Sequence, residues 1–429
     1  MLAFLFSWGA HRNSRLANPD HSKSDQGAYI DYAIRLAETD RSWVGNRNQM
    51  PLVPMLQSIF HRPGMSEAEF FETGKRVNIA FALLACLVVG WLGARSLPGH
   101  AAVNFALIAT FCHLVFRAPY FKAEVLYYLF VFMAFLVALR ALRSPGLGWG
   151  LWFGLFCAIA HYCKASTQPL MAAFVGVMAL RAAGDALRCP APGGRVRRCL
   201  PPLLCALFAV VTFLALLAPY LLNSKRVYGR YFYNVNSTFY VWYDSWSEVK
   251  RGTRAAGDRV GWPKLPPDQI PSARKYFREH TVGQIAARQW AGMRLQIKNL
   301  VGAHGSFKYL ALAFAAAGLM AWRNRTLLRA WAHPHRWPMG FAAAYLSLSF
   351  LAISWYSILA DGSRFVMALY LPLLFSGFWL ATHLPDTQVT LAGRTASLRD
   401  LLQRVVTAIL GVEIPFNLLV RLTDEFGGA

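Results

Sequence analysis

Charged residues are scarce in this chain, and acidic residues are the scarcest of them. Only 15% of the 429 residues are charged, with 21 Asp and Glu against 44 Lys and Arg, while 56% are hydrophobic. A soluble globular protein carries about 25% charged residues. The apolar residues also come in long blocks rather than in an alternating pattern. This composition predicts an integral membrane protein built of helices.

Further absences exclude other classes. The formal net charge of +23 would suit nucleic acid, but no nucleic-acid motif is present. Loop Lys and Arg that set orientation or meet anionic lipid explain the excess better. None of the seven cysteines lies in the long polar segments 11–76 and 223–305, so no disulfide framework is predicted. No metal-ligand spacing appears, so no metal site and no cofactor are predicted.

The long apolar runs predict ten membrane spans. They lie at 77–97, 101–116, 124–140, 147–162, 167–181, 200–222, 306–322, 339–359 and 365–383, with a weaker one at 403–421. Residues 1–10 are too short to cross a bilayer. They are either the outer end of a first helix whose beginning is absent, which we favour, or an interfacial anchor. The expected fold is all-α and polytopic, with about 10–11 spans. Residues 1–383 would form the transmembrane module, and 384–429 a cytoplasmic connector and a C-terminal membrane segment.

Basic loop residues predict the orientation of the spans. If residues 11–76 lie outside, alternation places outside the segments 117–122, 161–166, 223–305 and 361–364. The densely basic loops then lie inside, as the positive-inside rule requires. Their clearest members are Arg188, Arg195, Arg197, Arg198, Arg323, Arg325, Arg329 and Arg336. We expect a bacterial inner membrane, with the long polar segments facing the periplasm.

Amphipathic helices are expected in both long polar segments. Residues 52–60 have helical apolar spacing and predict a helix that lies on the membrane. Ser66 followed by Glu69 is a capping-box signal for the helix leading into the next span. Residues 276–280 and 285–297 predict amphipathic helices that return to the membrane.

One carboxylate, Asp25, stands just ahead of a short predicted helix. Ser24 is a good N-cap, which would put Asp25 in the first turn, where the helix dipole favours a charged carboxylate. Helical spacing places Tyr29 and Tyr32 on the same face, whereas Asp31 points elsewhere. An ionised carboxylate beside two aromatic rings suits a general base in a sugar-binding cleft.

Several spans present a cation at the same outer face. Arg117 and Lys122 lie near Glu124, Lys164 ends an apolar helix, and Arg364 begins a span. Each cation alone could bind lipid headgroups, and Glu124 could simply pair with Lys122 or Arg117. Together they suit the phosphate of a lipid, because a leaving phosphate needs positive charge and an attacking hydroxyl needs a nearby carboxylate. The combination predicts group transfer from a lipid phosphate.

Short motifs along residues 23–380 carry a family resemblance. They are Asp25-Gln26-x-x-Tyr29, Arg47-Asn48-Gln49-Met50-Pro51-Leu52, Lys164 after the small-residue helix 154–160, Arg226-Val227-Tyr228-Gly229, and Arg364-Phe365 before Leu371-Pro372. In order and sidedness the chain resembles the GT-C superfamily of membrane glycosyltransferases. It looks most like the protein O-mannosyltransferases and the bacterial lipid A aminoarabinose transferase.

The resemblance implies a sugar donor on a polyprenyl phosphate and a protein, lipid or glycan acceptor. Asp25 would be the general base or the orienting carboxylate. The donor phosphate would be held by Lys164, Arg364, Arg117 and Lys122. Substrate would be bound by Gln26, Tyr29, Tyr32, Arg47, Asn48, Glu124 and Arg226. The family commonly has an acidic pair where this chain has Asp25-Gln26, which leaves the base and any dependence on a divalent metal open.

Two other classes compete with a glycosyltransferase. A transporter or flippase of lipid-linked substrates would place charges near the bilayer midplane and repeat its halves. This sequence keeps its charges at span ends and has no repeat. A non-catalytic membrane protein that binds a partner through its outer loops is the second alternative.

Overall fold

A computed structural model describes residues 1–22, 25–40, 45, 47–188, 192–303, 306–360, 362–391 and 393–422. Two sequence-predicted features, the Ser24 cap and the Asp361 start of the 361–364 segment, lie outside these ranges. The described chain is mostly helical, as expected.

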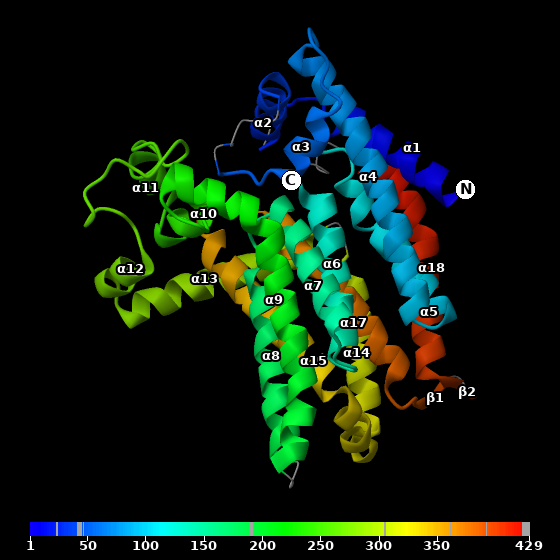
Figure 1. Ribbon diagram of the computed structural model, residues 1–429. Coiled ribbons are helices and arrows are strands. Elements are labelled where there is room, and N and C mark those ends of the chain that lie inside the picture. Colours follow the sequence, from blue (N-terminus) through cyan, green and yellow to red (C-terminus); the bar gives the residue numbers. More distant parts are fainter. Residues whose placement is uncertain are drawn as a thin grey trace.

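The long helices form a bundle (Figure 1). Eight helical segments in the described ranges are long and apolar enough to cross a membrane, so the chain is an integral membrane protein. They are Glu67–Ser96, Gly99–Phe116, Glu124–Ala141, Gln168–Leu187, Arg195–Tyr228, Arg325–Ser357, Ser363–His383 and Leu398–Arg421. Two more of the ten predicted spans appear as helices of 17 residues, α7 (Leu147–Cys163) and α14 (Phe307–Arg323).

The remaining bounds follow the chain order. The bundle elements are α1 (Leu2–Leu16), α4 (Glu67–Ser96), α5 (Gly99–Phe111), η1 (Leu114–Phe116), α6 (Glu124–Ala141), α8 (Gln168–Leu187), α9 (Pro192–Tyr228), α15 (Arg325–Ser357), α16 (Ser363–Val366), η3 (Met367–Leu369), α17 (Tyr370–His383), α18 (Leu398–Phe416) and the π-helix η4 (Asn417–Arg421). The two polar segments hold α2 (Gln26–Glu38), α3 (Leu52–Ser58), α10 (Val235–Thr238), η2 (Tyr240–Trp242), α11 (Trp246–Arg251), α12 (Ala273–Glu279) and α13 (Val282–Gly302).

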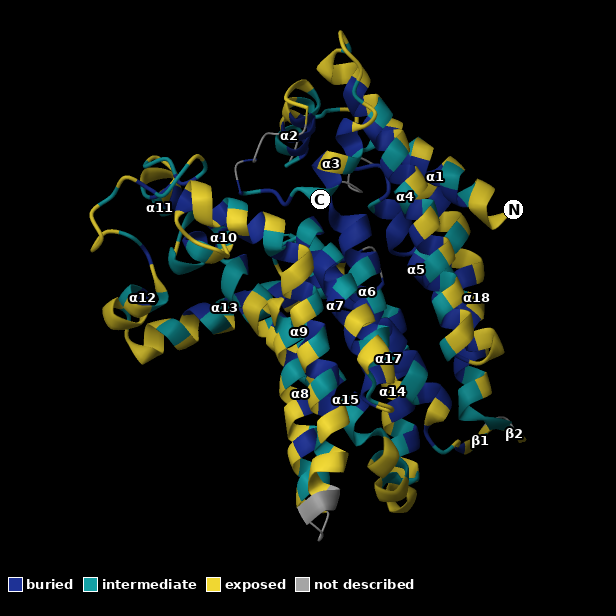
Figure 2. Ribbon diagram, in the orientation of Figure 1, coloured by how far each residue is buried: buried dark blue, intermediate teal, exposed yellow. Residues whose placement is uncertain are grey.

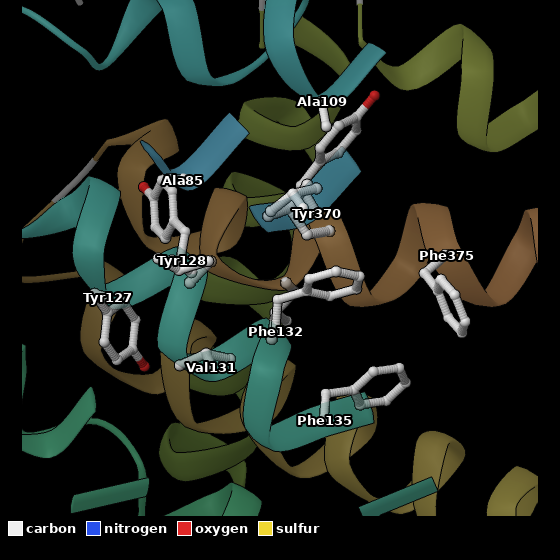
Figure 3. Close-up of a cluster of buried hydrophobic side chains, with 14 of the residues drawn as sticks. Ala85, Ala109, Tyr127, Tyr128, Val131, Phe132, Phe135, Tyr370 and Phe375 are labelled. Carbon is white, nitrogen blue, oxygen red and sulfur yellow. The ribbon is translucent and has the colours of Figure 1, made fainter. Parts of the chain in front are cut away.

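Helix α6 lies at the centre of the bundle. Figure 3 shows aromatic side chains of α6 gathered with Tyr370 and Phe375 of α17. Phe132 and Phe375 meet with ring centroids 5.8 Å apart in a T-shaped arrangement, a geometry that aromatic quadrupoles favour. Exposed residues lie along the outer helices (Figure 2), where apolar side chains such as Leu87 and Leu203 would face lipid.

The small residues of α7 have a packing role. A Cβ at Gly150 would lie 2.3 Å from the backbone oxygen of Cys205, and one at Gly154 would lie 2.4 Å from that of Ala209. Both contacts are with α9, so α7 and α9 touch backbone to backbone, as small residues permit between membrane helices. This contact fixes the C-terminal end of α7, which carries Lys164.

The connector departs from the all-α expectation. Strands β1 (Gln388–Leu391) and β2 (Arg394–Ser397) form an antiparallel hairpin in which Gln388 pairs with Ser397. Gly393 supplies the positive φ of 77° in the turn. Beyond the hairpin, α18 packs against α5, where Asn104 Nδ2 donates to Gln403 Oε1 at 2.9 Å.

The two polar segments meet at one end of the bundle, whereas the hairpin lies at the other (Figure 1). The backbone N–H of Val235 donates to the carbonyl of Arg47 at 3.1 Å, which joins the segments directly. The predicted capping box is present, because Ser66 and Glu69 cap α4 reciprocally. The expected helices at 52–60, 276–280 and 285–297 correspond to α3, α12 and α13.

Candidate functional site

A cavity of about 610 Å³ lies where the two polar segments meet the span ends. Its wall includes residues from α2, the start of α6, the α7–α8 connection, α10, α11, α15 and α16. Its volume is that of a typical small-molecule site. Of the residues predicted to act on substrate, the cavity wall includes Asp25, Tyr29, Asn48, Glu124, Lys164 and Arg364.

Asp25 faces an arginine instead of capping its own helix. Its Oδ2 accepts a hydrogen bond from Arg364 Nη1 at 2.6 Å, and its side chain is 48% exposed. The expected position in the first turn was wrong by one residue. Asp25 is the N-cap of α2 and makes no side-chain capping bond. A charge-assisted bond to a guanidinium is stronger than a capping bond, which accounts for the direction of the carboxylate.

Glu124 and Lys164 form a second ion pair in the same cavity. Glu124 Oε1 lies 3.3 Å from Lys164 Nζ, and the Glu124 side chain is only 7% exposed. The sequence left Lys122 or Arg117 as partners for this carboxylate, but the structure pairs it with a lysine 40 residues away. Since a buried charge requires a partner, the start of α6 and the end of α7 are tied together here.

Lys122 adds positive charge behind the wall. Glu124 interacts electrostatically with Lys164, Arg364 and Lys122. Lys122 also interacts electrostatically with Asp25. Burial lowers the pKa of Lys122 to about 8, and burial also lowers the pKa of Lys164. Three cations thus face two carboxylates.

Arg117 lies outside the cavity wall and bonds to the residue next to Arg364. Its Nη2 donates to Ser363 Oγ at 2.8 Å, one residue before Arg364. It also interacts electrostatically with Lys122. Arg117 therefore supports the start of α16 and adds to the positive potential without facing the cavity itself.

Three predicted substrate-binding residues instead hold the polar segments in place. Gln26 is fully buried, and its Oε1 accepts from Asn18 Nδ2 at 3.1 Å and from the Phe121 backbone N–H at 2.9 Å. Arg47 donates to Asn223 Oδ1 at 2.8 Å and lies 4.0 Å from the Tyr220 ring centroid. Tyr32 is 2% exposed and does not line the cavity.

Asp25, Tyr29 and Tyr32 were expected on one helix face, but the two tyrosines lie in different environments. Tyr29 lines the cavity at 7% exposure, and burial raises its pKa well above the usual range, so it stays a neutral phenol. Tyr32 packs against the Gly45 backbone. Arg226, predicted to bind substrate, is exposed near the end of α9, away from the cavity wall.

From the second polar segment, sequence reasoning named Arg226 and missed the residues that lie on the cavity wall. Its residues on the cavity wall include Asn234, Asn236, Trp246, Arg254 and Arg259. The signal was present as a run of Asn, Trp and Arg between residues 234 and 259. The run follows no helical or strand period, so the sequence could not assign it to the wall.

Within the described residues, no group of three or more His, Cys, Asp or Glu side chains could hold a metal ion. The question of a metal therefore stays where the sequence left it.

Comparisons add no relative to this geometry. No family model matches the chain, and neither a curated protein nor a solved structure matches it.

Proposed function

We propose that this protein is a glycosyltransferase that moves a sugar from a polyprenyl-phosphate donor to an acceptor hydroxyl or amine. The observation that carries the proposal is the pairing of Asp25 with Arg364 beside the Glu124–Lys164 pair in one cavity at the span ends. One cavity wall thus holds a carboxylate for the acceptor and cations for the donor phosphate. We also propose that the chain is a GT-C-type enzyme.

The reaction would proceed by displacement at the anomeric carbon. A lone pair of the acceptor oxygen forms the new bond to that carbon, and the bond to the donor phosphate oxygen breaks. The electron pair of the broken bond leaves with the polyprenyl phosphate. The acceptor proton passes to the Asp25 carboxylate and then to water, which balances the step.

The Asp25 carboxylate has one oxygen free for this role. Oδ2 is held by Arg364, whereas Oδ1 makes no hydrogen bond within the described residues. The half-exposed side chain can reach an acceptor from the cavity. Arg364 fixes the orientation of the carboxylate, so the proton-accepting oxygen is directed before substrate arrives.

The cations would stabilise the leaving phosphate. Arg364 has donors beyond the one used on Asp25, and Lys164 lines the same wall. Positive charge held in a partly dry site counts most where negative charge develops, which is on the phosphate oxygen in the transition state. Glu124 keeps Lys164 charged and in place through their 3.3 Å contact.

The donor lipid would lie on an apolar part of the same cavity. Ala352 and Ile353 of α15 and Ala368 and Leu369 of η3 line it, next to the charged residues. A polyprenyl chain could enter there between spans, while its phosphate remains at the level of Lys164 and Arg364. On the positive-inside orientation, this level faces the periplasm of a bacterial inner membrane.

A transfer assay in membranes tests the proposal. Membranes with wild-type protein, given radiolabelled polyprenyl-phosphate sugars and membrane acceptors, are expected to move label to the acceptor. Arg364→Gln should remove this transfer, because it removes both the phosphate contact and the orientation of Asp25. Arg294→Gln, on an exposed surface of α13, is the matched control.

If the wild type transferred label from none of the donors, this result would contradict the proposed enzyme activity. A flippase would instead carry the intact labelled lipid across the bilayer, which is measured in sealed vesicles with the same donors. Transfer that survives Arg364→Gln at equal expression would contradict the assigned site.

A further inference from the structure

The cavity has a second wall that the proposed transfer does not use. The second polar segment contributes Asn234, Asn236, Trp246, Arg254 and Arg259 to it. None of these residues makes an ion pair with Asp25 or Glu124 among the described residues. We call these five residues the second-segment wall.

Amide groups of this wall are fixed from three directions. Asn236 Nδ2 donates to Asn48 Oδ1 of the first segment at 3.1 Å, and Tyr356 of α15 donates to Asn236 Oδ1 at 2.9 Å. Asn234 caps α10, accepting from the Asn236 backbone N–H at 3.0 Å. The wall is therefore a prearranged polar surface and not an open loop.

The two arginines interact electrostatically with the adjacent carboxylate, Asp258, but form no close ion pair with it. Within the described residues, neither Arg254 nor Arg259 makes an ion pair, and the buried Nε of Arg259 has no hydrogen-bond partner. The adjacent carboxylate, Asp258, is completely buried and accepts from Tyr240 Oη at 3.3 Å. Burial raises the pKa of Asp258, while the charges of Arg259 and Arg254 act in the opposite direction.

An aromatic face completes the wall. Trp246 lines the cavity, and the guanidinium of Arg254 lies 5.9 Å from its ring centroid. An indole face packs on the apolar face of a sugar, amides bond to hydroxyls, and guanidinium forks match carboxylate and phosphate. These three groups together fit a sugar that carries a negative charge.

We propose that the second-segment wall is the acceptor subsite and that the acceptor is an acidic sugar bearing a carboxylate or phosphate. The role of this ligand as the acceptor rests on the proposed function, whereas the binding of an acidic sugar is argued from the second-segment wall alone. Arg254 and Arg259 bind the anionic group, and Trp246 and the asparagines hold the ring. The sugar hydroxyl then points to the cavity that Asp25 also lines.

A donor-free binding experiment tests the inference independently of transfer. Purified full-length protein in detergent is titrated by calorimetry with a disaccharide ending in glucuronate, the matched disaccharide ending in glucose, and a phosphorylated disaccharide. The acidic probes are expected to bind at least about tenfold more tightly than the neutral one, because charge-assisted hydrogen bonds are the stronger kind.

Variants assign the preference to the wall. Arg254→Gln combined with Arg259→Gln should abolish the preference for the acidic probes, and Arg254→Lys should keep part of it. Arg251→Gln, an exposed neighbour outside the cavity wall, is the matched control and should keep all of it. Thermal unfolding of each purified variant shows whether it is folded.

Equal binding of acidic and neutral probes by the wild type would overturn the inference. A preference that survives the double Arg254→Gln, Arg259→Gln change would overturn it as well. Neither result depends on a donor, so failure of the inference is distinct from failure of transfer. Carrying the glucuronate probe on an alkyl chain identifies the source: tighter binding indicates a glycolipid acceptor, and unchanged binding a soluble glycan.

Discussion

Two clusters of carboxylate and cation lie at span ends, and they differ in one respect. At the first, Asp25 and Glu124 pair with Arg364 and Lys164 on a cavity wall. At the second, Glu413 of α18 is 5% exposed and contacts Lys308, Arg421 and Tyr309. No member of the second cluster lines the cavity.

The comparison teaches that charge at a span end is not by itself a site. Glu413 fastens α18 to α14 through Lys308 and Tyr309, and none of these three residues lines the cavity. The Asp25 carboxylate has similar partners but is 48% exposed and borders open volume. Substitutions in the first cluster should therefore affect chemistry, and those in the second should affect folding alone.

The sharpest test of this contrast is Asp25→Asn. It should lower the transfer rate by about 10²–10⁴-fold, because the amide cannot take the acceptor proton. Initial rates in membranes with labelled donor measure the loss. Asp31→Asn is the matched control, since Asp31 is exposed and bonded only to Arg35 within the described residues. An unreduced rate in Asp25→Asn would move the base elsewhere.

Lys164→Ala should affect both folding and donor binding. It leaves Glu124 buried without its ion-pair partner, which costs about 3 kcal/mol of unfolding free energy, and it should raise the donor KM. Thermal unfolding and transfer kinetics measure the two effects. Adding Glu124→Gln should restore stability but not donor affinity. Donor KM unchanged in Lys164→Ala would contradict the phosphate role.

Glu413→Gln should destabilise without reducing transfer. The amide loses its ion pairs to Lys308 and Arg421, at a cost of about 1–2 kcal/mol. The midpoint temperature of thermal unfolding should fall, while the transfer rate of the folded protein stays at the wild-type value. A loss of rate at full folding would show that the second cluster takes part in the reaction and would end the contrast.

The smallest expected effect concerns pH. Lys122 has its pKa lowered to about 8 by burial, so it is charged below that pH and neutral above it. Its help to donor binding is thus present below pH about 8 and lost above. Donor KM measured from pH 7 to 9 should rise a few-fold in the wild type and stay flatter in Lys122→Arg, since arginine remains charged. Identical pH profiles would contradict the role of Lys122.

Local patterns of the chain predicted much of the fold. Apolar blocks located the spans, the Ser66–Glu69 signal located the start of α4, and helical spacing located α3, α12 and α13. Such features depend on residues within a few positions of one another. The sequence did not predict the hairpin of the connector, because its strands have only four residues each.

The residues predicted for the site fell into two groups, those that line the cavity and those that make structural contacts. Residue types and sidedness brought out Asp25, Glu124, Lys164 and Arg364, and these do line one cavity. Gln26 and Arg47 have the same polar character but became structural contacts of the polar segments. Sequence cannot separate the two outcomes, because both put a polar side chain at the end of an apolar helix.

By itself, the sequence determined the membrane class, the spans and the span ends at which the charged residues gather. These follow from composition and local periodicity, since apolar area and helix pitch are properties of neighbouring residues. Only the tertiary structure decided which charges meet. The partners Asp25 and Arg364 are 339 residues apart, and their contact exists because the packing of α2 on the bundle brings them together. The second-segment wall depends on the same kind of long-range contact, which no local pattern encodes.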